Sequence, residues 1–212
     1  TNNGSSRDAP VSTIKRALEL AQSCQNIILL DGEYSESNVQ IDYDVCIKGE
    51  GNATLTGETS FAGSSVFVLK NLKINNLNNG TFITQNTNDL LISNCIFTNN
   101  RALLVYNSGF TSISNSILLN NSKIINNVNN CVLDYNWWGN TVPDLNISKF
   151  ATLNLTSDVS ALENNHKANV RAVFYLNDGS KYTNLPNINL DISSINGSIN
   201  KNVTGIDENV IS

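Results

Sequence analysis

The chain has 212 residues, of which 40% are hydrophobic and only 15% charged, and its formal net charge is −5. This length allows one large or two modest domains with a buried core. The acidic balance, without any basic run, gives no electrostatic support to a nucleic-acid partner. No stretch approaches the roughly 18 apolar residues of a membrane helix, so we expect no membrane insertion within this segment.

Residues 1–10 read as a flexible lead-in, and a helical pattern follows. One helix face is indicated by four apolar residues at i, i+3, i+4 and i+7: Ile14, Ala17, Leu18 and Ala21. Ser12 is a suitable N-cap. The first coil of a stacked array leaves an apolar end and unpaired strand edges, which another element must cover. We therefore predict an N-terminal capping α-helix over residues 11–23.

Short strands with Asn, Gly or Ser corners follow the helix. We expect them at residues 26–30, 39–41, 45–47, 53–55, 66–69 and 72–74. Such corners need residues that tolerate left-handed backbone angles, and Asn and Gly do so most easily. Strands this short become stable when each pairs with its equivalent one coil away, at a spacing of about 4.8 Å.

A step of 21 residues organises the chain from about residue 66 to residue 140. Residues 90–100 reappear at 111–121, which matches Ile92 with Ile113, Phe97 with Leu118, and Asn100 with Asn121. Two further series keep this step: Ile83, Leu104 and Ile125, and Asn94, Asn115 and Asn136. A fixed step made of short strands predicts a solenoid, here of about five coils. The second series would form an amide ladder along one corner.

The repeat ends at Trp137 and Trp138. Neighbouring residues on a strand face opposite sides, so one indole would plug the last coil and the other would be exposed or covered by the following domain. This packing reading is favoured. In the alternative reading, an exposed indole stacks on a sugar ring. The candidate carbohydrate-binding residues are Trp137, Trp138, Tyr135, Asn94, Asn115 and Asn136.

Five segments together resemble the adhesin-like surface proteins of methanogenic archaea: residues 12–18, 28–34, 46–51, 92–100 and 136–140. The Asn-Trp-Trp-Gly-Asn ending at 136–140 is the most specific of them. The resemblance spans nearly the whole chain. It implies a right-handed parallel β-helix of the pectin-lyase-like class, followed by bacterial-Ig-like repeats. It also implies an extracellular, cell-surface location, and we expect the chain to be a segment of a longer, secreted and anchored protein.

The pattern changes after residue 140. Alternation at 150–156, 168–176 and 187–192, with turns at 177–179 and 196–197, predicts a β-sandwich. The 64 residues from 149 to 212 fall short of the roughly 100 of a complete Ig-type domain. We therefore predict an all-β chain with two parts: a parallel β-helix with its N-terminal cap over 11–140, and a partial Ig-like β-sandwich over 149–212.

The cysteines form no metal-binding pattern, and His166 is the one histidine. We favour buried thiols at the four positions Cys24, Cys46, Cys95 and Cys131, with Cys24 and Cys46 as the leading candidate for a disulfide. Glycosylation of the exterior is permitted by sequons that begin at Asn3, Asn52, Asn79, Asn120, Asn146, Asn154, Asn196 and Asn202.

Catalytic clusters are missing from the repeat. Lyases of the resembled class use an arginine beside calcium-binding carboxylates, and the hydrolases use clustered aspartates. Here Arg101 stands alone, and Asp89 and Asp134 are far apart in the sequence. Four acidic residues could together bind calcium, but a structural role in turns is the favoured prediction for them: Asp31, Glu33, Asp42 and Asp44. We predict no catalytic residue, no metal site and no cofactor.

The first hypothesis is a non-enzymatic cell-surface adhesin segment. Its rigid β-helix would bind glycans or proteins on another cell or surface, and we expect it to be a monomer. One alternative is a pectin-lyase-like polysaccharide lyase or hydrolase. The other is a structural stalk without a ligand.

Overall fold

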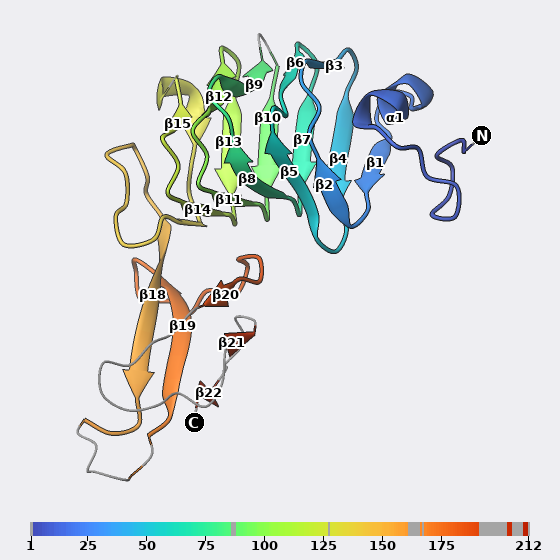
Figure 1. Ribbon diagram of the computed structural model, residues 1–212. Coiled ribbons are helices and arrows are strands. Elements are labelled where there is room, and N and C mark those ends of the chain that lie inside the picture. Colours follow the sequence, from blue (N-terminus) through green and yellow to red (C-terminus); the bar gives the residue numbers. More distant parts are fainter. Residues whose placement is uncertain are drawn as a thin grey trace.

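The computed structural model describes residues 2–85, 88–126, 128–160, 166, 168–190, 203–204 and 210–211. Its main body is a parallel β-helix in which each coil contributes one strand to each of three sheets. The described strands form five complete coils and part of a sixth. Figure 1 shows the coils stacked side by side as a rod, with the N-terminal helix at one end. The expected all-β solenoid is confirmed.

The first sheet holds six parallel strands. They are β1 (Asn26–Leu29), β4 (Val45–Gly49), β7 (Phe67–Lys70), β10 (Leu90–Ser93), β13 (Thr111–Ser114) and β16 (Cys131–Val132). The third sheet holds five: β3 (Val39–Ile41), β6 (Phe61–Gly63), β9 (Thr81–Gln85), β12 (Leu103–Asn107) and β15 (Lys123–Ile125). A short 3-10 helix, Val128–Asn130, separates β15 from β16.

The second sheet is the one that continues beyond the solenoid. Its solenoid strands are β2 (Gly32–Tyr34), β5 (Ala53–Gly57), β8 (Lys73–Leu77), β11 (Ile96–Thr98), β14 (Ile117–Leu119) and β17 (Asn136–Trp137). Three more strands extend it: β18 (Phe150–Ser157), β19 (Val170–Leu176) and β22 (Val210–Ile211). The C-terminal part of the chain is therefore attached to the solenoid through a shared sheet.

Like residues stack along the interior of the rod. Ile92 pairs in register with Ile113, and Phe97 with Leu118, as the repeat predicts. Phenylalanine rings form a continuous column, with Phe82 lying 5.7 Å from Phe61 and 6.5 Å from Phe97 between ring centroids. The buried interior explains why strands of three to five residues are stable here: each has a parallel partner and an apolar inner face.

One predicted alignment is displaced to the neighbouring residue. Ile83 pairs with Val105, and Val105 pairs with Ile125, so Val105 and not Leu104 occupies the middle coil. The step from Ile83 to Val105 is slightly longer than the repeat, and the step from Val105 to Ile125 is shorter by the same amount. Leu104 is nevertheless buried, as is its neighbour Val105 in β12.

Helix α1 (Ile14–Leu20) covers the first coil, as Figure 1 shows. Ile14 and Leu18 are buried in the same core as the solenoid residues, which confirms the capping role. The predicted N-cap is wrong: Thr13, not Ser12, accepts the hydrogen bond from the backbone N–H of Arg16. The helix is also shorter than expected, since Ala21 already has an extended backbone.

The C-terminal part begins with an antiparallel pair. Strands β18 and β19 pair from Ala151–Leu176 to Ser157–Val170. The predicted turn at 177–179 is confirmed, because Gly179 donates a backbone hydrogen bond to Leu176. Strand β20 (Asn189–Leu190) pairs with β21 (Val203–Thr204). The predicted turn at 196–197 and the last two residues of the predicted 187–192 strand lie outside the described residues, and an Ig-like sandwich over 149–212 stays a prediction.

All four cysteines lie in the described part of the chain, and no disulfide joins any of them. The Cys24–Cys46 disulfide is therefore wrong, and full burial holds for Cys95 alone, while Cys24 is exposed. No helix in the described residues has the length and apolar character needed to cross a membrane.

Candidate functional site

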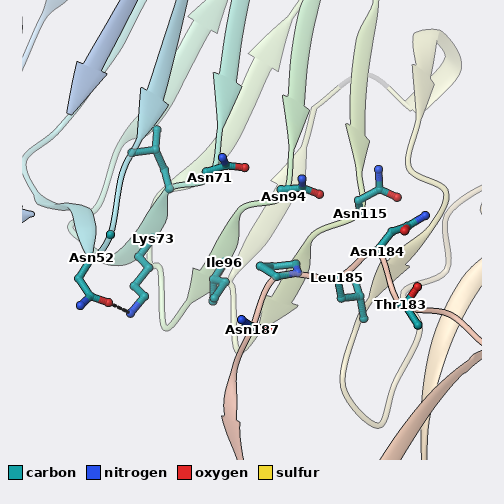
Figure 2. A pocket seen from close by; sticks show the side chains of 13 residues that line it. Asn52, Asn71, Lys73, Asn94, Ile96, Asn115, Thr183, Asn184, Leu185 and Asn187 are labelled. Atoms are coloured by element: carbon teal, nitrogen blue, oxygen red, sulfur yellow. Dashed lines mark hydrogen bonds between the residues drawn. The ribbon is translucent and has the colours of Figure 1, made fainter. Parts of the chain in front are cut away.

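A groove of about 620 Å³ lies between the solenoid and the segment that follows β19. Its solenoid wall is the bend between the first and second sheets, and its other wall is formed by residues 183–187. Figure 2 shows asparagines from successive coils lining up along this bend, with the C-terminal segment facing them. The groove is thus made by segments that lie far apart in the sequence.

Three asparagines occupy the same bend in three successive coils: Asn71, Asn94 and Asn115. Their φ angles are 54°, 53° and 51°. This left-handed backbone turns the chain from one sheet into the next with few residues, and Asn tolerates it better than most residues that carry a side chain. Since coils stack at about 4.8 Å, the bend repeats an amide group at that interval along the rod.

The amides of this row differ in their partners. The Asn115 Oδ1 accepts a hydrogen bond from the hydroxyl of Tyr182. Within the described residues, the side chains of Asn71 and Asn94 form no hydrogen bond, and both residues are exposed. Each of these amides offers two N–H donors and a carbonyl acceptor. Two of the three amide groups are therefore available to a ligand.

The second wall is fixed to the solenoid by Tyr182. Its hydroxyl also lies 3.4 Å from the carbonyl oxygen of Tyr135, and the two rings stack at 6.1 Å between centroids. Burial raises the pKa of Tyr182 to about 12, and the nearby Tyr135 acts in the same direction. Leu185 is buried in the small core beside it. These contacts hold residues 183–187 at a defined place opposite the asparagine row.

Lys73 supplies the one charge among the residues that line the groove. Its Nζ donates to Asn52 Oδ1 at 2.7 Å, as Figure 2 shows. The lining contains no carboxylate. Apolar surface comes from Ile96, Leu185 and Pro186. Amides, an ammonium group and small apolar patches bind a polar ligand by hydrogen bonds and contacts.

In the described residues, no three His, Cys, Asp or Glu side chains are grouped so that they could hold a metal ion. Several of the acidic residues considered for calcium or catalysis serve turns instead. Asp31 and Asp44 accept backbone hydrogen bonds from Asn52 and Val66 at 2.6 and 2.9 Å. Asp134 accepts from the backbone of Ser148 at 2.7 Å.

The groove contains two of the sequence-predicted site residues, Asn94 and Asn115. Asn136 is not the third member of their row. It is buried, and Tyr135, with a φ of 65°, occupies the equivalent bend. Asn71 was missed because the spacing between it and Asn94 is longer than the step of the repeat. The position of Asn71 between two short apolar strands could have identified it, because a left-handed corner is required there.

The predicted amide ladder along Asn94, Asn115 and Asn136 is therefore wrong, and ladders form at two other positions. The Nδ2 of Asn100 donates to Asn121 Oδ1 at 2.8 Å, inside the rod. The Nδ2 of Asn120 donates to Asn99 Oδ1 at 3.3 Å, on its surface. The matched pair Asn100 and Asn121 was already visible in the repeat.

Trp137 and Trp138 lie outside the groove and are buried, each with 7% of its surface exposed. Trp138 packs into the solenoid core, and Trp137 packs into the small core below the C-terminal segment. Both indoles therefore take part in packing, and both also line a second pocket of about 500 Å³. Tyr135 is 40% exposed and borders the groove through its contact with Tyr182.

The sequon asparagines of the described chain share one property. All six are exposed: Asn3, Asn52, Asn79, Asn120, Asn146 and Asn154. Asn196 and Asn202 lie outside the described residues. Arg101, the isolated arginine of the repeat, is exposed as well.

No protein-family model matches this sequence, and neither a curated protein nor a solved structure matches it.

Proposed function

We propose that this chain is a non-enzymatic, glycan-binding segment of a cell-surface adhesin. The observation that carries the proposal is the row of bend asparagines, in which Asn71 and Asn94 face the groove with unengaged amides. A sugar hydroxyl both donates and accepts hydrogen bonds, and an amide offers both partners. The groove also provides apolar contacts for the C–H faces of a sugar ring through Ile96 and Leu185.

Rigidity supports the same proposal. The bend asparagines belong to a backbone paired on both sides by parallel strands. A ligand that binds there does not have to order the protein backbone, so little conformational entropy is lost on the protein side. The repeat of the amides at the coil spacing favours an extended polymer over a small compact ligand. We propose glycans on another cell or surface as the partner, with the chain acting as a monomer.

The wider assignment rests on the resemblance in sequence. An adhesin-like surface protein of archaeal type would present the β-helix outside the cell, on spacer domains. The exposed sequon asparagines and the low charge are consistent with such an exterior. The absence of carboxylates from the groove lining favours binding over hydrolysis at this place, because hydrolases need acid–base pairs.

The test is a glycan array probed with the wild-type chain and with Asn71→Gly and Asn94→Gly. Glycine accepts the left-handed backbone, so these changes remove the amide without straining the bend. We expect each to weaken glycan binding about two- to tenfold, the effect of one or two lost hydrogen bonds. Asn76→Gly and Asn99→Gly are matched controls, since both residues have φ near 55° in the same two coils but lie outside the groove, Asn76 within β8 and Asn99 directly after β11.

Three results would count against the proposal. Binding to no glycan would favour a stalk without a ligand. Equal losses in the groove variants and the controls would place the site elsewhere on the rod. Unsaturated products or new reducing ends, after incubation with polysaccharides, would replace the adhesin with an enzyme of the lyase or hydrolase type.

A further inference from the structure

Three lysines gather at the N-terminal end of the asparagine row. Lys48 is the last residue but one of β4, and Lys70 occupies the paired position in β7, one coil further on. Both point outward, because each follows a buried residue in its strand. Lys73 begins β8 on the other side of the bend and lines the groove. The result is a positive corner on a chain of net charge −5.

Like charges at paired positions of neighbouring strands destabilise a sheet. Two nearby carboxylates have other partners: Glu50 is paired with Arg7, and Asp31 accepts from the backbone of Asn52. None of the ion pairs found in the described chain includes Lys48, Lys70 or Lys73. The repulsion between the lysines is thus not relieved by a direct ion pair in the described chain.

This corner is continuous with the groove. Gly49 packs so closely on the next coil that a Cβ atom there would lie 2.3 Å from the carbonyl oxygen of Asn71. The coil that carries Lys48 therefore contacts the first asparagine of the row directly. On the other side, Lys73 contacts Asn52, which also lines the groove. A polymer lying along the asparagine row would reach Lys73 inside the groove, and Lys70 directly precedes Asn71, the first asparagine of the row.

We propose that the ligand of the groove is an anionic polysaccharide whose carboxylate or sulfate groups bind at Lys48, Lys70 and Lys73 while its hydroxyl groups bind the amides of Asn71 and Asn94. This inference rests on the proposed function and adds the ligand class to it. Charge complementarity selects the occupant, because the corner has three ammonium groups and the groove lining has no carboxylate. The residues that line the groove include no aromatic ring on which the bases of a single-stranded nucleic acid could stack.

The experiment measures affinity of the whole chain for four probes: alginate, dextran sulfate, neutral dextran and a single-stranded oligonucleotide. We expect one or both anionic polysaccharides to bind more tightly than dextran, and to bind less tightly as salt is raised. The double variant Lys70→Gln/Lys73→Gln should weaken this binding about three- to tenfold, since exposed ion pairs contribute up to about 1 kcal/mol each. Lys15→Gln/Lys123→Gln, which neutralises two exposed lysines outside this corner, should change it less than twofold.

The outcomes separate the two proposals. If dextran binds as tightly as alginate and dextran sulfate, and the lysine variants change nothing while Asn71→Gly weakens binding, the anionic ligand is wrong and the glycan-binding function stands. If no polysaccharide binds, both are wrong. If the oligonucleotide binds as tightly as the polysaccharides, charge alone explains the corner and the inference is overturned. Tighter binding of alginate would identify carboxylates as the acidic groups of the ligand, and tighter binding of dextran sulfate would identify sulfates.

Discussion

Trp137 and Trp138 are consecutive in the sequence but pack into two different hydrophobic cores. Trp138 closes the interior of the solenoid. Trp137 faces the other way, and its ring lies 4.9 Å from that of Phe174 at an interplanar angle of 68°. Trp137 ends the two-residue strand β17, and Trp138 follows it on the opposite side of the chain. Strand β17 pairs with β18 and so joins the end of the rod to the C-terminal part.

The two indoles provide separate reporters for these cores, because the chain has only two tryptophans. In Trp137→Phe the remaining indole reports on the solenoid, and in Trp138→Phe it reports on the junction. We expect the urea midpoint seen at the junction to be the lower one, since its core has far fewer buried residues. Coincident fluorescence midpoints in the two variants would show instead that both cores unfold as one unit.

The buried side chain of Trp138 also carries an unsatisfied polar group, which lowers the stability of the fold. Its indole Nε1 is buried and has no hydrogen-bond partner in the described structure. Trp138→Phe removes this unsatisfied donor along with part of the ring, so it should destabilise the chain by only about 1 kcal/mol, against about 3–5 kcal/mol for Trp138→Ala. Urea unfolding measured by circular dichroism checks both values. Equal losses would mean that the indole N–H contributes nothing unfavourable.

Asn136 holds the last coil through buried backbone groups. Its Nδ2 donates to the carbonyl oxygens of Ile113 and Leu133 at 2.7 and 2.8 Å, and its Oδ1 accepts from the N–H of Ser116 at 2.9 Å. Asn136→Ala leaves all three groups unsatisfied, which should cost about 3 kcal/mol or more. Calorimetry should show a lowered Tm, while the exposed Asn140→Ala stays within about 0.5 kcal/mol of wild type.

Glu36 caps α1 from a different part of the chain. Its two carboxylate oxygens accept hydrogen bonds from the backbone N–H groups of Ile14 and Lys15, at 2.6 and 3.1 Å. Glu36→Ala should therefore lower stability by about 1–2 kcal/mol and should speed amide hydrogen exchange in α1. The exposed Glu33→Ala is the control. Unchanged exchange at Ile14 and Lys15 in Glu36→Ala would contradict the capping role.

Cys95 should be protected from modification in the folded chain, since burial raises the pKa of its thiol to about 12. At pH 8, iodoacetamide should label the exposed Cys24 first and Cys95 only after unfolding. Because the folded pKa is above the unfolded value of about 9, the unfolded state loses its proton first as pH rises. Stability should then fall between pH 9 and 12, by up to about 1.4 kcal/mol per pH unit, and less so in Cys95→Ala. Rapid labelling of Cys95 in the native chain would show that it is accessible.

The strand positions and most of the register were predictable from the sequence. Parallel strands in neighbouring coils pair at equal spacing, so a repeat of constant length translates directly into partners such as Ile92 and Ile113. The errors at Leu104 and Asn136 have one cause, which is that the coils differ in length. The coil from Ile117 to its partner Trp137 is shorter than the coil from Phe67 to its partner Leu90. An extra or missing residue in a polar turn leaves no mark on the apolar pattern.

The candidate site was predictable only in part. Asn94 and Asn115 were visible as corner residues, but their orientation toward a groove was not. The opposite wall comes from residues 183–187, whose place against the solenoid depends on Tyr182 reaching Asn115 across 67 residues of sequence. No local pattern records such a contact.

Periodic apolar residues and left-handed asparagine corners are local properties, so they were enough to predict that this chain stacks short strands into a capped β-solenoid. Tertiary structure alone decided which asparagines remain free, where the two indoles pack, and that Lys48, Lys70 and Lys73 meet at one corner. Those features depend on which coil lies beside which, and on how the C-terminal segment folds back over the second sheet.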